Sequence, residues 1–280
     1  MKKVIIPTDF SANSKRALRI AAKVAQKSGA GLSILHTNVA VAYAPVLPEY
    51  EFSGVYNMQD YYDMAADEFR HMKQELVAEP EFGQLKIDTR IEEGMLHSSI
   101  RRVTEDETAD LIVMGTKGAS GAMEFFVGSN TEKVIRTAPC PVLAVPEGSG
   151  DFNPKVVVLA STLSEDQAPA FRYLAEWQKY WPFKVEVLYL NNPGLFGSKK
   201  QIDVIAADLA ERTGLHKVST FININTFNEE ATILEFAQQE KADLIVMATH
   251  QRQGLSHLLF GSITENTSNH SSIPVLCVPV

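Results

Sequence analysis

The sequence has few cysteines: Cys140 and Cys277 are the only two among its 280 residues. One pair gives no disulfide framework, and it gives no spacing of thiolates for a structural zinc site. Each cysteine lies close to proline and apolar residues. We therefore expect both to be buried, uncharged residues of a hydrophobic core.

Long apolar runs are also missing. The longest, such as residues 111–114 with their flanks, are strand-sized and fall short of the roughly 18 residues that span a membrane. The opening "MKKVIIPTDF" has few apolar residues before Pro7 and Asp9, whereas a signal peptide needs an apolar region of about 7–15 residues. We therefore expect no membrane partner and a cytoplasmic location.

Positive charge is not in excess, because the formal net charge is -8 and the sequence pI is about 5.4. A broadly basic surface for nucleic acid is therefore not expected, since phosphate contacts need clustered lysine and arginine. The composition, with 45% hydrophobic and 21% charged residues, is that of an ordinary globular protein. It supplies enough apolar material for two modest cores or one large one.

The sequence contains an internal repeat. "ADLIVMGTKGASGAMEFFVGSNTEKVIRTAPCPVLAVP" begins at Ala109, and "ADLIVMATHQRQGLSHLLFGSITENTSNHSSIPVLCVP" begins at Ala242, 133 residues later. The halves open with "KKVIIPTDFS" and "PKVVVLASTLS", which we align 152 residues apart, so that the first half is about 19 residues longer. Residues 147–154, "EGSGDFNP", have the composition of a linker. We therefore predict two domains of similar plan, residues 1–147 and 154–280.

Each half alternates short apolar runs with amphipathic segments, which predicts alternating strands and helices. We expect strands at 4–7, 32–36, 85–91, 111–114 and 142–145, and at 156–159, 185–190, 218–224, 244–247 and 275–278. One helix should be capped by Ser11 or Asp9 and end at Gly29, and others should lie near 60–78, 98–107 and 130–137. Apolar strands separated by helices indicate a parallel sheet covered on both faces. The predicted fold is α/β, with two tandem, doubly wound, five-stranded parallel-sheet domains.

A ligand site is expected beyond the carboxyl ends of the strands, where loops 7–11, 37–39 and 115–129 begin. The last loop, "GTKGASGAMEFFVGS", places Gly115, Gly118 and Gly128 before Ser129. Glycine permits close approach of a ligand to the main chain. The amino end of the helix that follows favours an anion. These features together predict a cradle for a polyphosphate.

The spacing Gly115-x2-Gly118-x9-Gly128-Ser129 resembles the ATP-binding signature of the universal stress protein family. "PTDFS" at residues 7–11 resembles the first loop of that family, and "GSNTEKV" and "PCPVLAVP" resemble its closing helix and last strand. The resemblance covers both halves. It implies a tandem family member with the Rossmann-like, adenine nucleotide alpha hydrolase-like fold, acting as an ATP-binding module in a stress response.

By the same resemblance, Asp9 lies near the ribose, and the backbone around Thr37 holds the adenine edge. The implied ligand is ATP with magnesium, and no metal site built by protein side chains is predicted. Capping of helices by Asp9 and Ser129 is an alternative that is compatible with these roles. The residues implied in binding are Pro7, Thr8, Asp9, Thr37, Met114, Gly115, Thr116, Gly118, Gly128, Ser129 and Asn130.

The second half departs from the signature. Ala248 and Gln251 stand at the positions of Gly115 and Gly118, and our alignment matches Asp9 with Ser161. A side chain as large as that of Gln251 would fill the space that a phosphate needs. We therefore predict that the second domain keeps the fold and has lost or weakened ATP binding. The histidines of this region lack the spacing of metal ligands and are interpreted as solvated or capping residues: His250, His257 and His270.

Two classes of function follow. In the first, the protein is a binding module in which bound nucleotide sets a conformation that an unknown protein partner reads; its domains pair through strands 142–145 and 275–278, and two chains form a homodimer. In the second, it is an enzyme such as an ATPase, kinase or adenylating protein. The sequence has no P-loop and no spacing typical of a nucleophile with its base, so no catalytic residue is predicted and slow ATP hydrolysis stays open. A flavin-binding or redox relative is disfavoured by the phosphate-binding spacing.

Overall fold

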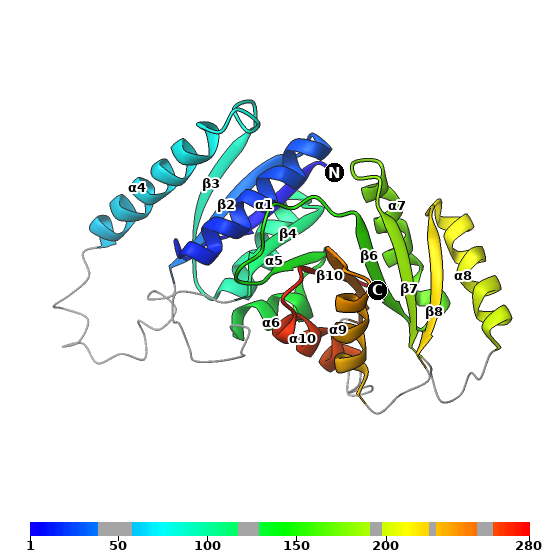
Figure 1. The fold of residues 1–280 in the computed structure, drawn as a ribbon. Coiled ribbons are helices and arrows are strands. Elements are labelled where there is room, and N and C mark those ends of the chain that lie inside the picture. Colours follow the sequence, from blue (N-terminus) through cyan, green and yellow to red (C-terminus); the bar gives the residue numbers. More distant parts are fainter. Residues whose placement is uncertain (39–57, 117–128, 191–197, 224–227, 251–259) are drawn as a thin grey trace, which may run out of the picture.

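The computed structural model describes residues 1–38, 58–116, 129–190, 198–223, 228–250 and 260–280 (Figure 1). The first half contains β1 (Lys3–Pro7), α1 (Ala12–Ser28), β2 (Gly31–Asn38), α4 (Met58–Val77), β3 (Ile87–Glu93), α5 (Leu96–Glu107), β4 (Leu111–Gly115), α6 (Ser129–Thr137) and β5 (Val142–Val145). The second half contains β6 (Val156–Ser161), the 3-10 turn η2 (Glu165–Gln167), α7 (Ala168–Gln178), β7 (Lys184–Leu190), α8 (Lys199–Thr213), β8 (Val218–Asn223), α9 (Glu229–Gln239), β9 (Leu244–Thr249), α10 (Phe260–His270) and β10 (Val275–Pro279). The predicted α/β fold is confirmed.

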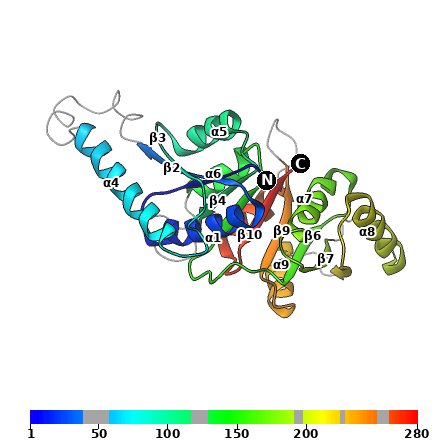
Figure 2. The same cartoon turned by 90° about the horizontal axis from the view of Figure 1, so that it is seen from above.

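The ten strands of the described residues form one sheet, in the order β3-β2-β1-β4-β5-β10-β9-β6-β7-β8. Figure 2 shows β3 and β2 toward one end of this sheet and β6 and β7 toward the other. Within each half the strands are parallel. The halves meet where β5 and β10 pair antiparallel, with Leu143 opposite Leu276. The closing strands therefore pair as the sequence predicted, and two five-stranded sheets become one.

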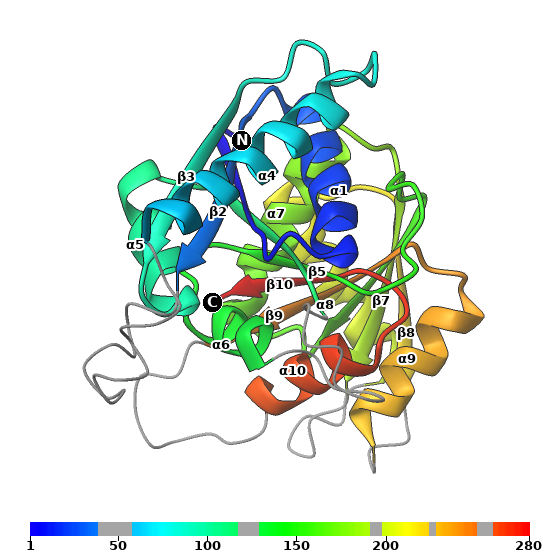
Figure 3. The same ribbon diagram turned by 90° about the vertical axis from the view of Figure 1, so that its left-hand side faces the viewer.

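Helices cover both faces of the sheet (Figure 3). Alternate residues of β1 show the division, because Val4 and Ile6 enter one apolar core and Ile5 enters the other. The first core receives side chains from α1, α4, α7 and α8, and the second receives them from α5, α6 and α9. Each core extends through both halves, so the tandem domains share their hydrophobic interior.

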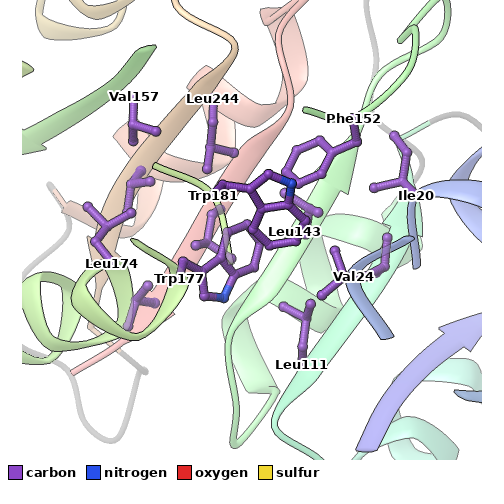
Figure 4. Close-up of a cluster of buried hydrophobic side chains, with 14 of the residues drawn as sticks. Ile20, Val24, Leu111, Leu143, Phe152, Val157, Leu174, Trp177, Trp181 and Leu244 are labelled. Carbon is purple, nitrogen blue, oxygen red and sulfur yellow. The ribbon is translucent and has the colours of Figure 1, made fainter. Parts of the chain in front are cut away.

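An aromatic cluster packs at the junction of the halves (Figure 4). The rings of Trp177 and Trp181 on α7 lie 5.4 Å apart between centroids. Phe152, from the segment predicted to be a linker, meets them edge-on at 5.9 and 5.7 Å. Phe152 is 4% exposed, and the hydroxyl of Tyr173 donates to the Asp110 carbonyl of the first half at 2.9 Å. The linker is therefore part of the shared core and not only a spacer.

Helix α1 packs closely against β4. Its amino end is capped by Ser11, whose side chain accepts a hydrogen bond from the Ser14 amide, and its carboxyl end stops at Gly29 in the left-handed conformation, with φ of 72°. A Cβ added to Gly115 would lie 2.6 Å from Nδ2 of Asn13. Glycine at this strand end therefore leaves room for the Asn13 side chain, apart from any ligand.

Both cysteines are buried, as predicted. Burial raises the pKa of the Cys140 thiol to about 12, so it stays protonated and unreactive at neutral pH. Among the described residues, no helix has the length and apolar character that crossing a membrane requires.

The aromatic cluster predicts the cost of truncating Phe152. Phe152→Ala should lower the free energy of unfolding by about 3–5 kcal/mol, because it opens a cavity in the shared core. Phe221→Ala is the matched control at the outer strand β8, where the phenylalanine is 36% exposed, and its loss should be smaller. Urea unfolding followed by the fluorescence of the two tryptophans measures both. Equal losses would contradict the central role of Phe152.

The contact between Gly115 and Asn13 predicts a coupled pair of substitutions. Gly115→Ala should cost about 1–3 kcal/mol of unfolding free energy, as overpacking does. In an Asn13→Ala background the same change should cost less, because the clashing amide is gone. A double-mutant cycle in urea measures the coupling, and a coupling near zero would show that the close contact has no energetic weight.

Candidate functional site

The loop after β1 is held from within. The Thr8 amide donates to the Leu35 carbonyl at 2.8 Å. The Thr8 hydroxyl accepts from the Phe10 amide at 3.0 Å and lies 2.9 Å from the Ser14 hydroxyl. Since the Ser14 hydroxyl donates to the Ser11 carbonyl, Thr8 is the donor to Ser14. These bonds fix a tight turn in which Phe10 has φ of 62°, an uncommon conformation for an aromatic residue.

Asp9 lies at the exposed corner of this turn. Its carboxylate accepts from the Ser11 amide at 3.1 Å, whereas the cap of α1 comes from Ser11. The choice between Asp9 and Ser11 as the cap, which the sequence left open, is therefore settled for Ser11. Asp9 is exposed and Thr8 is buried, so the two neighbours differ in role: Thr8 builds the loop and Asp9 presents a carboxylate at its edge.

The end of β2 carries His36, Thr37 and Asn38. Thr37 is half-buried, and Asn38 is 2% exposed. His36 was not predicted to matter beyond its place in a strand. Its Nδ1 lies 2.7 Å from the Thr8 carbonyl, and its Nε2 lies 2.7 Å from the Tyr61 hydroxyl of α4. Burial lowers the pKa of His36, although the Thr8 carbonyl and the Asp9 carboxylate favour its charged form.

The end of β4 is anchored to its surroundings. The Thr116 amide donates to the Val145 carbonyl at 3.0 Å, and the Thr131 hydroxyl of α6 donates to the Gly115 carbonyl at 3.0 Å. Met114 packs into a core and Thr116 is buried. The buried side chains of Met114 and Thr116 therefore stabilise the end of β4 from the protein interior.

The remaining predicted residues lie in β1, at the start of α6 or outside the described residues. Ser129 begins α6, and Asn130 in its first turn is exposed. Pro7 is the buried last residue of β1. Gly118 and Gly128 lie outside the described residues, as does the side chain of Ser129.

The strand order brings the described part of the site together. β1 lies between β2 and β4, so Asp9, just beyond β1, lies at the same edge of the sheet as Thr37 and Gly115, which are at the carboxyl ends of β2 and β4. The chain reaches β2 on one side of β1 and β4 on the other, which makes this the topological switch point where open α/β sheets bind ligands. The arrangement offers one carboxylate, main-chain groups of strand ends and the first turn of α6. It brings together no pair of side chains suited to nucleophilic or general acid–base catalysis among the residues described.

The strand register corrects our alignment of the halves. Val4 faces Leu111 in the first half, and Val157 faces Leu244 in the second. Thr8 therefore corresponds to Ser161, and Asp9 corresponds to Thr162, so the match of Asp9 with Ser161 was wrong by one residue. The hydroxyl of Ser161 accepts from the Leu163 amide at 3.0 Å, as Thr8 does from Phe10. The turn is preserved, and the carboxylate at its corner is replaced by a hydroxyl.

The second half places a different group at its strand ends. Asp166, which corresponds to Asn13, contacts Nε2 of His250 at 2.7 Å beside the end of β9. Partial burial opposes the ionisation of Asp166, but hydrogen bonds from Ser164 and His250 outweigh it and lower the pKa of Asp166. The glycine whose lack of a side chain accommodates Asn13 is Ala248 here. This edge therefore carries a carboxylate paired with an imidazole at a position where the first half has the neutral amide of Asn13.

Two histidines of the second half, His250 and His270, have acidic partners. Besides the contact of His250 with Asp166, Nδ1 of His270 is hydrogen-bonded to Glu230 of α9. The interpretation of these two as solvated or capping residues was therefore incomplete, because each forms an ion pair when protonated. His257 lies outside the described residues.

Comparison with known proteins supports the family on both halves. The sequence model of the Universal stress protein family matches residues 1–146 and 154–279. A universal stress protein of Thermus aquaticus is 34% identical over 151 residues, which are 51% of this chain and 98% of that protein. A universal stress protein from Archaeoglobus fulgidus has a TM-score of 0.71 at 19% identity, covering 99% of this chain and 98% of its own.

A further solved structure, a universal stress protein in complex with cAMP, is 22% identical with a TM-score of 0.35, covering 52% of this chain and 96% of its own.

The two segments that the family model matches leave only residues 147–153 and Val280 unmatched. The chain belongs to the universal stress protein family and carries two domains of that family in tandem.

Proposed function

We propose that the first half, residues 1–147, binds one adenine nucleotide, ATP with magnesium, at the carboxyl ends of β1, β2 and β4. The observation that carries the proposal is the convergence of Asp9, Thr37 and Gly115 at the switch point of the sheet. This is the place where the glycine-rich signature of the sequence begins. The protein acts as a binding module whose nucleotide-bound form is read by a protein partner, with two chains pairing as a homodimer.

The roles of the residues follow from their positions. Asp9, exposed beyond the β1 strand end, contacts the ribose, since a carboxylate accepts hydrogen bonds from hydroxyl groups. Main-chain groups near Thr37 hold the adenine edge. The phosphates lie along the glycine-rich segment and the first turn of α6, where the helix dipole and the amides of the helix start favour anions: Gly115, Thr116, Gly118, Gly128, Ser129 and Asn130. Thr116 contributes by holding the strand end, because its amide already donates to the Val145 carbonyl. Magnesium supplies charge neutralisation to the phosphates.

The second half, residues 154–280, keeps the fold and has a degenerate site. Thr162 replaces the carboxylate of Asp9, and Gln251 replaces Gly118. The Asp166 carboxylate adds a negative charge near the end of β9, and like charges repel a phosphate. One nucleotide per chain is therefore the proposed stoichiometry.

Isothermal titration of the purified chain with Mg-ATP measures that stoichiometry. We expect one site per chain, and at 100 times the dissociation constant the nucleotide should add roughly 2.7 kcal/mol to the unfolding free energy. Two equal sites would contradict the proposed degeneracy of the second half. Absence of any heat or thermal shift would reject the proposed function.

A matched pair of substitutions locates the site. Gly118→Val should abolish the Mg-ATP-induced thermal shift, because a branched side chain fills the space for the phosphates. Gln251→Val, the change at the corresponding position of the second half, should leave the shift intact. A shift that persists in Gly118→Val would move the nucleotide elsewhere. Steady release of phosphate by the wild type that is lost in Gly118→Val would instead identify an ATPase.

A further inference from the structure

His36 lies at the centre of the contacts around the β1–α1 loop. Its Nδ1 and Nε2 lie 2.7 Å from the Thr8 carbonyl and the Tyr61 hydroxyl respectively. A carbonyl oxygen can only accept, so Nδ1 carries the proton and donates to Thr8. Nε2 of the neutral ring is then the acceptor for Tyr61. The geometry alone therefore fixes the tautomer of His36.

The imidazole ring also holds the residue on the other side of Asp9. The Phe10 ring lies 4.4 Å from the His36 ring between centroids, and Phe69 of α4 packs edge-on against Phe10 at 5.5 Å. Phe10 has φ of 62°, a conformation that persists only when its surroundings enforce it. His36 thus fixes both neighbours of Asp9, Thr8 by a hydrogen bond and Phe10 by ring contact.

The second half supports a link between this histidine and the acidic corner. The register places Pro7 opposite Leu35 in the first half and Ala160 opposite Leu188 in the second. The residue after Leu188, which corresponds to His36, is Tyr189. Leu163 stands in place of Phe10, and Thr162 in place of Asp9. The half without the carboxylate is therefore also the half without the imidazole and the aromatic ring that rests on it.

We propose that His36 is a positioning residue of the nucleotide site, which holds the Asp9 carboxylate toward the ribose by donating from Nδ1 to the Thr8 carbonyl and supporting the Phe10 ring. The inference rests on the proposed function. The effect of His36 on binding is transmitted through the loop it anchors.

Two amide substitutions separate the two nitrogens of the ring. In His36→Asn the amide nitrogen takes a position near that of Nδ1 and keeps the donor to Thr8. In His36→Gln the amide reaches the position of Nε2 and loses that donor. For Mg-ATP measured by isothermal titration, we expect His36→Gln to weaken binding about tenfold, equivalent to about 1.4 kcal/mol, and His36→Asn to weaken it less than about threefold.

Tyr62→Phe is the matched control. It removes a neighbouring tyrosine hydroxyl that bonds to Glu93 of β3 and not to His36, so its affinity for Mg-ATP should equal that of the wild type. Equal affinities of His36→Asn and His36→Gln would overturn the role of the Nδ1 donor. A wild type that fails to bind Mg-ATP would instead reject the proposed function, and the experiment below then decides whether His36 holds the loop.

The pH dependence of stability tests the contact without a nucleotide. The titratable groups that face His36 are Asp9 in its loop and Tyr61 on α4, with the Tyr62–Glu93 pair beyond them. Because burial lowers the pKa of His36, the unfolded chain takes up a proton first as the pH falls. The stability that neutral His36 provides is therefore complete above about pH 6.5 and is lost below it.

The melting temperature of the wild type should accordingly fall further between pH 7.5 and pH 5.0 than that of His36→Asn, which has no imidazole to titrate. Nitrogen chemical shifts of the His36 ring at pH 7.5 should show a protonated Nδ1 and an unprotonated Nε2. Parallel melting curves together with the opposite tautomer would overturn the arrangement on which the inference is built.

Discussion

The antiparallel pairing of β5 with β10 is the contact on which the architecture depends. It removes an exposed edge from each five-stranded sheet, where unpaired backbone groups would otherwise face water or another chain. It also brings α7 of the second half over the first, so that Trp177, Trp181 and Phe152 close a common apolar interior. The linker contributes Phe152 to that interior, so the segment that joins the halves also takes part in their packing.

The candidate site is a consequence of strand order and of a small number of substitutions on one scaffold. Both halves build the same turn after their first strand, with Thr8 or Ser161 accepting from the amide two residues later. What differs is the corner that the turn presents, which is the carboxylate of Asp9 in the first half and a hydroxyl in the second. The scaffold is therefore shared, and the chemistry is local.

Sequence patterns predicted the strands, the repeat and the pairing of the closing strands because each depends on apolar residues at short, regular spacing. Sequence patterns failed where contacts between distant segments determine the structure. The contacts of His36 join three separate segments, which no local pattern encodes. The alignment of Asp9 with Ser161 was wrong by one residue because the apolar runs of β1 and β6 can be aligned at two neighbouring offsets. The strand register shows which offset is correct. The core position of Phe152 was not predicted because the residues around it have the composition of a linker.

Covalent joining of the halves at this junction has an evolutionary consequence. When two identical chains form a dimer, the same sequence supplies both subunits, and any change to a ligand site appears in both. Here the two sides are encoded separately. Selection can preserve the partner surface of the second half, around Trp177 and Leu276, while the strand ends diverge, as the contact of Asp166 with His250 shows. The fused pair can thus keep one common interior while the two copies of the domain change independently at their strand ends.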